Sequence, residues 1–276
     1  MNCISRPLKL YVIGNGFDLH HGMPCGYADF IAWLQGNRHE VYNGLNRIYG
    51  DCSGNNWSDF ENSLRGFNLD DYPDNVTREG LMQLKAGLNE ALLAWVKTIG
   101  MPEPKTAIDN IDRNAVFFTF NYTRTLEDFY GIDEDRIVHL HGSVDNGNLI
   151  FGHDSMGNAV SDEELKEARR TRMDADLYKD LVHIKMSQEF ADVFRKPVAE
   201  IIEEHGSDFD ALAGIKEMIV LGVSYSDIDM PYFERIVKVT GDNIKVTLGH
   251  HTFWDGNHAL AFDDAFGFSY ATLVEL

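Results

Sequence analysis

Polar side chains follow several apolar stretches of this chain, at the point where each stretch ends. A glycine-rich turn, Gly14-Asn15-Gly16, comes directly after the apolar run 8–13, with Asp18 just behind it. Asn121 and His141 each follow a later apolar run. A glycine-rich turn that opens a helix is a common phosphate site, because it offers free N–H groups and the positive end of the helix dipole. An imidazole can act as a base and a carboxamide can donate and accept hydrogen bonds, so these residue types predict a ligand site with acid–base chemistry.

The spacing of the glycine turn separates it from the two commonest phosphate loops. It is not a G-x-G-x-x-G fingerprint, because position 19 is Leu, and it is not a P-loop, because no Lys follows the glycines. The pattern is G-x-G-Φ-D-x-x-x-G-Φ-P, where Φ is apolar, and it continues through Phe17 and Gly22 to Pro24. The alternative is a tight strand–helix turn that holds no ligand.

The elements that must position these side chains alternate between strands and helices. Apolar runs predict strands at 8–13, 115–120, 137–140, 149–151, 218–221, 244–248 and 270–274, and helical spacing predicts helices at 27–34, 57–69, 76–99 and 232–239. The charged segment 161–205 has no strand pattern and is expected to be helical. Such alternation is typical of a Rossmann-like, doubly wound parallel sheet in an α/β protein. We expect one domain, 1–276, with helical insertions at about 27–105 and about 158–212.

In such a sheet, ligands bind outside the carboxyl ends of the strands. Gly222-Val223-Ser224 follows the run 218–221, and Tyr225 and Asp227 come just after it. Four predicted strands therefore deliver polar groups to one edge, which favours a binding site there. The alternative for Tyr225 and Asp227 is a turn and cap before the helix at 232–239.

Composition and charge exclude several classes of protein. The chain has 276 residues, of which 44% are hydrophobic, so it can bury a core. A net charge of -20 repels phosphate backbones, so no nucleic-acid partner is expected. No leader peptide and no membrane-spanning run are recognised, which predicts a cytoplasmic protein without a membrane partner. The cysteines Cys3, Cys25 and Cys52 form no C-x-x-C pair, and the paired histidines are poorly spaced as ligands, so no metal site is expected.

The sequence resembles the bacterial abortive-infection AbiH family over nearly its whole length. The resemblance implies a role in phage defence. The motifs that carry it stand in the expected order: Leu10 to Phe30, Trp57-x-x-Phe60-Glu61, Phe118-x-Phe120-Asn121-Tyr122-Thr123, His139-Leu140-His141-Gly142, Phe151-Gly152-His153 and Gly222-x-Ser224-x-Ser226-Asp227-x-Asp229.

The AbiH pattern is itself similar to the Sir2-like superfamily at the site. That similarity implies a Sir2-like fold, NAD as ligand, and cleavage of the nicotinamide–ribose bond. Two departures matter. Thr123 stands where sirtuin deacylases have Asp, and the cysteines of their zinc module are missing, so NAD hydrolysis is favoured over protein deacylation. The matching positions are Gly14, Gly16, Gly22 and Pro24 for the nucleotide turn, Asn121 for the strand-end Asn, His141-Gly142 for the catalytic His and its Gly, and Gly222-Val223-Ser224 for the segment that holds the adenine-side ribose.

The resemblance implies a catalytic role for three side chains. His141 is expected to be the base, Asn121 to orient a ribose hydroxyl or a water, and Asp18 to bind a ribose hydroxyl or position water. The alternatives are a buried His141 bonded to backbone, an Asn121 that caps a helix over 123–130, and an Asp18 that caps the first helix or forms a salt bridge. The expected nucleotide-binding residues are Gly14, Asn15, Gly16, Phe17, Gly22, Gly142, Gly222, Ser224, Tyr225 and Asp227.

The resemblance leaves two functions open. The first is an anti-phage effector that hydrolyses NAD, an NAD glycohydrolase. The second is a sensor or interaction module that binds NAD or a related nucleotide without catalysis. A phage-derived trigger, a second defence protein and self-association are all compatible with both. Whether water or a ribose hydroxyl would attack the ribose also stays open.

Overall fold

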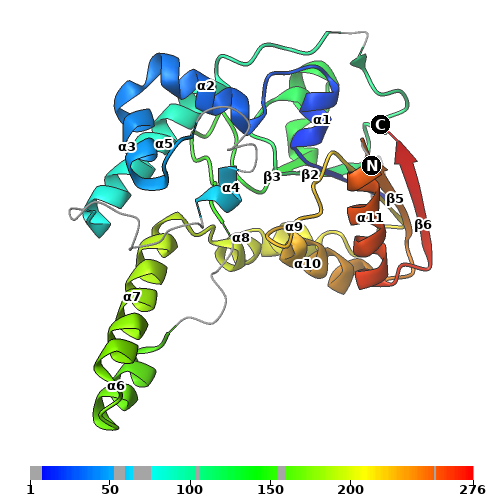
Figure 1. The fold of residues 1–276 in the computed structure, drawn as a ribbon. Coiled ribbons are helices and arrows are strands. Elements are labelled where there is room, and N and C mark those ends of the chain that lie inside the picture. The colour runs from blue at the N-terminus through cyan, green and yellow to red at the C-terminus, as the bar shows by residue number, and fades with distance from the viewer. Residues whose placement is uncertain are drawn as a thin grey trace. The chain divides into compact units, whose positions relative to one another are not determined.

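The chain forms two compact units, each described here by itself (Figure 1). The computed structural model describes residues 8–52, 60–64, 76–103, 106–153, 160–251 and 253–275. The first unit consists of Met1–Gly26, Leu93–Leu149 and Pro197–Leu276, and the second of Tyr27–Leu92 and Ile150–Lys196. A single domain with two helical insertions stays a prediction.

The first unit is built on a parallel sheet. Its strands are β1 (Lys9–Ile13), β2 (Val116–Thr119), β3 (Ile137–His139), β4 (Glu217–Leu221), β5 (Lys245–His250) and β6 (Tyr270–Glu275). They form one six-stranded sheet in the order β3-β2-β1-β4-β5-β6, and every neighbouring pair is parallel. This confirms the predicted α/β class. The strand order reverses between β1 and β4, which is where ligands bind in open sheets of this kind.

Helices of several lengths complete the two units. The first unit contains α1 (Asn15–His20), a π-helical turn η4 (Thr125–Phe129), η5 (Glu134–Arg136), α8 (Val198–Glu204), α9 (Gly206–Asp210), α10 (Met230–Thr240) and α11 (Phe253–Phe266). The second contains α2 (Tyr27–Asn37), α3 (His39–Tyr49), α4 (Phe60–Ser63), most of α5 (Arg78–Val96), α6 (Asp162–Arg170), α7 (Ala175–Ala191) and η6 (Asp192–Phe194). The expected helical character of 161–205 is confirmed. In the described part of the chain, no helix has the length and apolarity that a membrane crossing requires.

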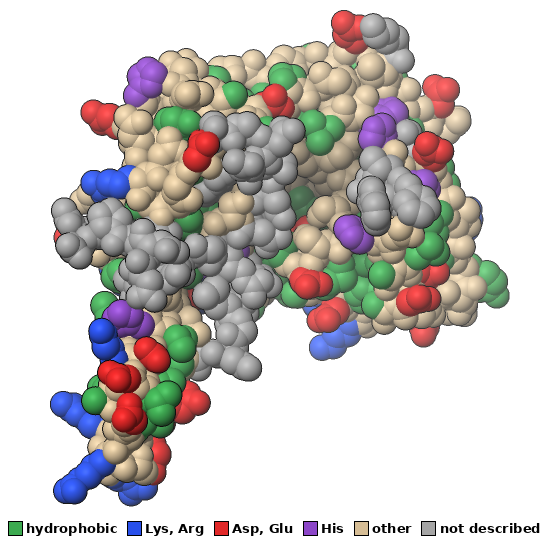
Figure 2. Space-filling view, in the orientation of Figure 1, with side chains coloured by type: hydrophobic (Ala, Val, Ile, Leu, Met, Phe, Trp, Pro, Cys, Tyr) green, Lys and Arg blue, Asp and Glu red, His purple; other side chains and the backbone are tan. Residues whose placement is uncertain are grey.

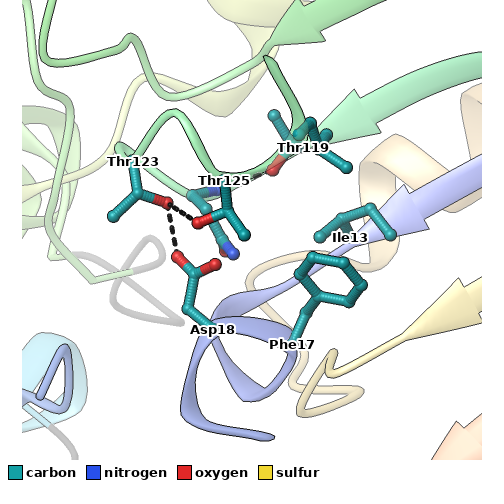
Figure 3. A pocket seen from close by; sticks show the side chains of 8 residues that line it. Ile13, Phe17, Asp18, Thr119, Thr123 and Thr125 are labelled. Atoms are coloured by element: carbon teal, nitrogen blue, oxygen red, sulfur yellow. Dashed lines mark hydrogen bonds between the residues drawn. The ribbon is translucent and has the colours of Figure 1, made fainter. Parts of the chain in front are cut away.

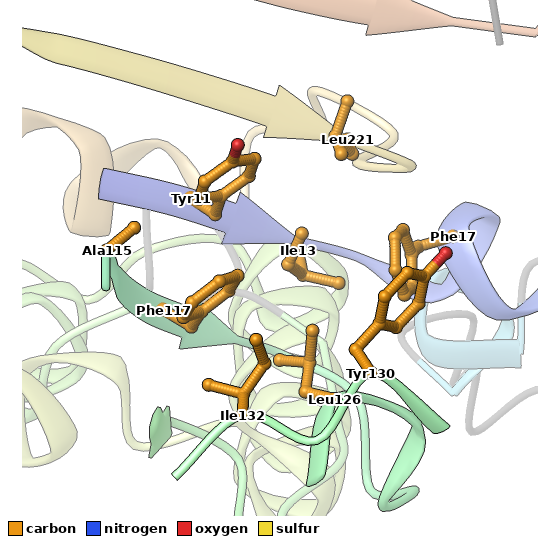
Figure 4. Packing of buried hydrophobic residues seen from close by; sticks show 9 residues of the cluster. All are labelled: Tyr11, Ile13, Phe17, Ala115, Phe117, Leu126, Tyr130, Ile132 and Leu221. Carbon is orange, nitrogen blue, oxygen red and sulfur yellow. The ribbon is translucent and has the colours of Figure 1, made fainter. Parts of the chain in front are cut away.

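The two faces of the sheet carry separate apolar cores, because successive strand residues point to opposite sides. On one face Tyr11 and Phe117 stack with ring centroids 4.9 Å apart, and Leu126 and Tyr130 join their cluster (Figure 4). On the other face Phe118 contacts Phe209 of α9 at 5.0 Å. Asp and Glu side chains are scattered over the visible surface, in keeping with the net charge of -20 (Figure 2).

One predicted strand is wrong. Residues 149–151 form no strand, and the nearest pairing is an isolated bridge between His153 and Arg195. Leu149 and Phe151 are buried, so their apolar character reflects core packing without a β-ladder. Of the predicted helix 57–69, residues 60–63 form α4, and residues 57–59 and 65–69 lie outside the described residues.

A buried ion pair joins two of the sequence motifs inside the second unit. Lys196 Nζ lies 2.8 Å from Glu61 Oε1, and the Lys196 side chain is only 1% exposed. The same carboxylate oxygen accepts a hydrogen bond from the Gly152 N–H at 3.1 Å. A Cβ at position 152 would lie 2.0 Å from the Phe194 carbonyl oxygen, so only glycine fits there. The Phe60-Glu61 and Phe151-Gly152-His153 motifs therefore have a structural explanation.

The glycine turn after β1 packs closely against the backbone at the end of β4. Gly14 N–H donates to the Leu221 carbonyl at 2.9 Å, and Gly16 N–H donates to the Gly222 carbonyl at 2.8 Å. Gly222 has φ +69°, and a Cβ there would lie 2.0 Å from the Phe17 nitrogen. This contact sets where α1 begins.

Replacing Gly222 by Ala is expected to lower the free energy of unfolding by roughly 3 kcal/mol or more, because it adds left-handed strain to a backbone clash. The matched control is Gly36→Ala in α2, where a Cβ meets nothing within 4 Å. That substitution should be neutral or stabilise by up to about 1 kcal/mol. Urea unfolding of both variants measures the difference, and equal stability would contradict the close-contact explanation.

Candidate functional site

A small pocket lies at the carboxyl ends of β1 and β2, within the first unit (Figure 3). Its side chains close it, so that no water-sized molecule fits inside. Asp18 reaches it from α1, and the segment after β2 supplies the facing side chains. The lining residues are Ile13, Phe17, Asp18, Thr119, Asn121, Thr123, Thr125 and Leu126.

Asp18 is a buried carboxyl group without a cationic partner among the described residues. It is 0% exposed, and its Oδ2 accepts a hydrogen bond from the Thr123 hydroxyl. Its Oδ1 has no hydrogen-bond partner in the described structure. Burial raises the pKa of Asp18, while the nearby polar side chains of Thr123, Thr125 and Asn121 oppose that rise. The expected alternatives, a helix cap or a salt bridge, are wrong, because the N-cap of α1 is Gly14 and the observed partner is a hydroxyl.

Asn121 lies beside Asp18 at the end of β2. Its backbone N–H donates to the Thr119 hydroxyl at 3.1 Å, which holds the turn that follows the strand. Its side-chain Oδ1 is buried and accepts no hydrogen bond from any described residue. The helix-cap alternative for Asn121 is wrong, because the helical turn η4 begins at Thr125 and its N-cap is Arg124. The structure therefore brings Asp18 and Asn121 together, each with an unsatisfied oxygen.

Two threonines complete this pocket, and neither was predicted as a site residue. Thr123 departs from the sirtuin pattern, yet its hydroxyl is the partner of Asp18. Thr125 donates to the Thr123 hydroxyl oxygen at 3.3 Å. The available signal was the T-x-T spacing directly after Asn121, which places two hydroxyls near one strand end.

His141 belongs to a different cluster. Its Nε2 lies 3.1 Å from the hydroxyl of Tyr232, a fully buried residue of α10, and the Phe120 ring stacks on the imidazole at 4.9 Å. Thr119 lines the Asp18 pocket whereas Phe120 packs on His141, and successive extended residues point to opposite faces. His141 and the Asp18 pocket therefore lie on opposite faces of the same sheet edge. Tyr232 was not predicted, because only the tertiary fold brings α10 to His141.

The other expected nucleotide-binding residues have packing explanations of their own. Gly14 and Gly16 face the Gly222 backbone, as described above, and Phe17 is part of the apolar core. A Cβ at Gly142 would lie 1.8 Å from the Asn148 carbonyl oxygen, and Gly22 has a positive φ of +73°. A ligand contact by these glycines stays a prediction.

Four polar residues expected at the site are placed as follows. The Asn15 side chain donates to the Cys25 carbonyl at 3.0 Å. Tyr225, which is buried with φ +55°, donates from its hydroxyl to the Gly249 carbonyl at 2.9 Å. Ser224 and Asp227 are exposed in the segment after β4. Among the residues that the structure describes, no group of three or more His, Cys, Asp or Glu side chains is arranged to hold a metal ion.

A family comparison covers both clusters. The sequence model described as "Bacteriophage abortive infection AbiH" matches residues 10–85 and 70–250, which include Asp18, Asn121 and His141. The chain belongs to this AbiH family. No curated protein and no solved structure matches it. AbiH membership implies a role in phage abortive infection, as the resemblance in sequence indicated.

Replacing Asp18 by Asn is expected to stabilise this AbiH protein at neutral pH. Folding raises the pKa of Asp18, so its contribution to stability is present below the unfolded pKa and is lost as the pH rises through the folded pKa. Asn does not titrate, so the gain, on the order of 1 kcal/mol, should grow from about pH 4 to pH 7. Urea unfolding compares Asp18→Asn with the exposed control Asp242→Asn. Lower stability of Asp18→Asn at pH 7 would refute the assignment.

A buried histidine holds the helix that carries Asp18. His21 Nδ1 lies 2.6 Å from the Phe17 carbonyl oxygen, and His21 Nε2 lies 2.6 Å from the Tyr130 hydroxyl, which accepts from the Ile108 N–H at 2.8 Å. A carbonyl only accepts, so Nδ1 carries the proton and Nε2 accepts from Tyr130. Burial lowers the pKa of His21, because it disfavours the charged ring.

The stability that His21 contributes is expected to fall in acid. The folded pKa lies below the usual 6.5, so the unfolded chain binds more protons as the pH drops below 6.5. The advantage of the wild type over His21→Gln should be largest above pH 6.5 and shrink toward pH 5. Thermal unfolding at both ends of this window measures it. An advantage that grows in acid would show that the ring is charged in the fold.

Proposed function

We propose that this AbiH protein binds NAD at the carboxyl edge of the sheet and cleaves its nicotinamide–ribose bond. The observation that carries the proposal is the pair of buried, unsatisfied oxygens on Asp18 and Asn121. Both are acceptors placed at the sheet edge, beside the point where the strand order reverses. A bound molecule with positive charge and hydrogen-bond donors would satisfy them.

NAD has this chemistry, because its nicotinamide ring is a pyridinium cation attached to a ribose with free hydroxyls. As the bond to nicotinamide breaks, positive charge moves onto the ribose carbon. A carboxylate in a water-poor pocket stabilises that charge more strongly than it would in water. The cation would also lower the raised pKa of Asp18, since an opposite charge favours the ionised form.

The hydrolysis of NAD is a balanced reaction when water is the nucleophile. The electron pair of the breaking bond stays with nicotinamide, which leaves as a neutral molecule. Water adds to the ribose carbon and gives its proton to a base, for which His141 is the proposed residue. Asn121 orients the attacking water or the ribose hydroxyl through its carboxamide. The products are ADP-ribose, nicotinamide and a proton.

The closed state of the pocket is consistent with a latent effector. The pocket leaves no room for a water-sized molecule, whereas small-molecule sites usually offer several hundred Å³, so a nicotinamide ring requires the pocket to open. An enzyme that destroys NAD would kill its own cell if it were constantly active. A resting state in which the pocket around Asp18 is closed fits that requirement.

The same observations favour a second candidate function, a nucleotide-binding sensor without catalysis. His141 packs against Tyr232 and Phe120, away from the Asp18 pocket. A site without its base would bind NAD or ADP-ribose and transmit the binding to a partner.

Intracellular NAD distinguishes the two functions. After induction and phage challenge, we expect the wild type to lose NAD and accumulate nicotinamide and ADP-ribose. Asp18→Asn and His141→Ala should slow that loss by on the order of 100-fold, because each removes a group that acts in the transition state. Mass spectrometry of cell extracts gives all three metabolites.

The control variant is His205→Asn, which changes a partly exposed His205–Asp208 pair outside both clusters and should leave NAD loss unchanged. Protection from phage with constant NAD in the wild type would overturn the hydrolase proposal and support the sensor. If NAD raised the melting temperature of the purified protein in a saturable way and no product formed, that result would further support the sensor function.

A further inference from the structure

His139, the last residue of β3, connects three segments of the first unit. Its Nδ1 lies 3.0 Å from the Asn121 carbonyl oxygen. Its Nε2 lies 3.0 Å from Glu127 Oε1, on the π-helical turn η4. The His139 side chain is 13% exposed and that of Glu127 is 7% exposed, so the pair is largely shielded from water. The ring therefore bridges β3, the turn after β2 and η4.

The geometry determines where the ring protons lie. A carbonyl oxygen only accepts, so Nδ1 must carry a proton to bond with Asn121. A carboxylate also only accepts, so Nε2 must carry a second proton to bond with Glu127. The contacts are thus satisfied by an imidazolium facing a carboxylate.

Glu127 has the surroundings of an ionised group. Burial alone would raise the pKa of Glu127. Instead the pKa lies below its usual value, because Glu127 accepts hydrogen bonds from His139 and the backbone and lies near the charges of His139 and Arg124. Arg124 lies 4.0 Å from the same carboxylate oxygen that faces His139. Asp18 is the other titratable group nearby, and the charge of Glu127 raises the pKa of Asp18.

The segment between the two contacts of His139 is the one that builds the pocket. Asn121, Thr123 and Thr125 come from it: the Thr123 hydroxyl donates to Asp18, the Thr125 hydroxyl donates to Thr123, and Asn121 lines the pocket beside them. One end is held through the Asn121 carbonyl and the other through Glu127. We propose that His139 is a positioning residue of the Asp18–Asn121 site, and that its bond to the Asn121 carbonyl sets where the carboxamide and hydroxyls stand. The consequence for catalysis rests on the proposed function, whereas the placement of the segment does not.

Two substitutions of His139 separate positioning from charge. In His139→Asn the amide nitrogen falls near the position of Nδ1 and keeps a donor for the Asn121 carbonyl. In His139→Gln the longer side chain keeps a donor for Glu127 and loses the bond to Asn121. Both variants are neutral, so they change the electrostatics around Asp18 equally. Their difference isolates the hydrogen bond to Asn121.

The primary readout is the carboxyl titration of Asp18, followed by carbon NMR in the ligand-free protein. We expect His139→Gln to titrate about one pH unit above His139→Asn, because a displaced segment gives Asp18 weaker hydrogen bonds. His205→Asn and His205→Gln, at the partly exposed pair with Asp208, should not differ. Equal Asp18 titration in the two His139 variants overturns the positioning role.

A nitrogen NMR measurement tests the pair without altering His139. The wild type should show two protected ring N–H protons for His139, and Glu127→Gln should retain the one at Nδ1. A wild-type ring without a protected proton at Nδ1 would overturn the proposed anchor.

The rate of NAD hydrolysis is a separate measurement. If the wild type hydrolyses NAD, His139→Asn should retain most of the rate and His139→Gln should lose at least about tenfold, with comparable melting temperatures. Equal rates overturn the catalytic consequence of positioning. If the wild type leaves NAD intact, the proposed function fails, and the Asp18 titration still decides the role of His139.

Discussion

A carboxyl group removed from water without a counter-charge is the constraint on which the rest of the site depends. Asp18 lies on a helix whose start is set by the contact of the glycine turn with Gly222, so it cannot move toward solvent without breaking that contact. The neighbouring residues compensate with hydroxyls and a carboxamide, which stabilise either protonation state but do not neutralise it. Such a group is poorly suited to stability and well suited to a ligand that brings the missing charge.

The sheet determines how the candidate residues can cooperate. Asp18 and Asn121 face the core formed with η4, whereas His141 faces the core formed with α9 and α10. A small ligand confined to one face would meet only one cluster. An elongated ligand that lies across the edge could meet both, and a dinucleotide is of that kind. The separation of the two clusters therefore favours an elongated ligand and decides which residues could act on it together.

The sequence predicted the sheet well because central parallel strands are buried on both faces and appear as continuous apolar runs. The same signal failed at 149–151, since burial alone does not imply a hydrogen-bonded ladder. Asp18 and Asn121 were predicted as site residues from their place after strands, and the structure brings them together. Thr123 as the partner of Asp18, Tyr232 as the partner of His141, and the anchor at His139 depend on contacts between distant segments. Local sequence patterns contain no information on those contacts.

A closed pocket around an uncompensated carboxyl group also explains how latency could arise without a separate inhibitor. In this structure, the Thr123 hydroxyl bonds to one carboxylate oxygen of Asp18, the other oxygen is enclosed, and burial favours the neutral acid. A cationic ligand that bound the enclosed oxygen would have to open the pocket and draw a proton away, so part of its binding energy would be spent on opening the site. A trigger that favours the open arrangement of the 121–125 segment would remove this cost and raise the apparent affinity. The same few hydrogen bonds would then both form the site and control ligand access to it. A phage signal would act through the segment between Asn121 and Glu127.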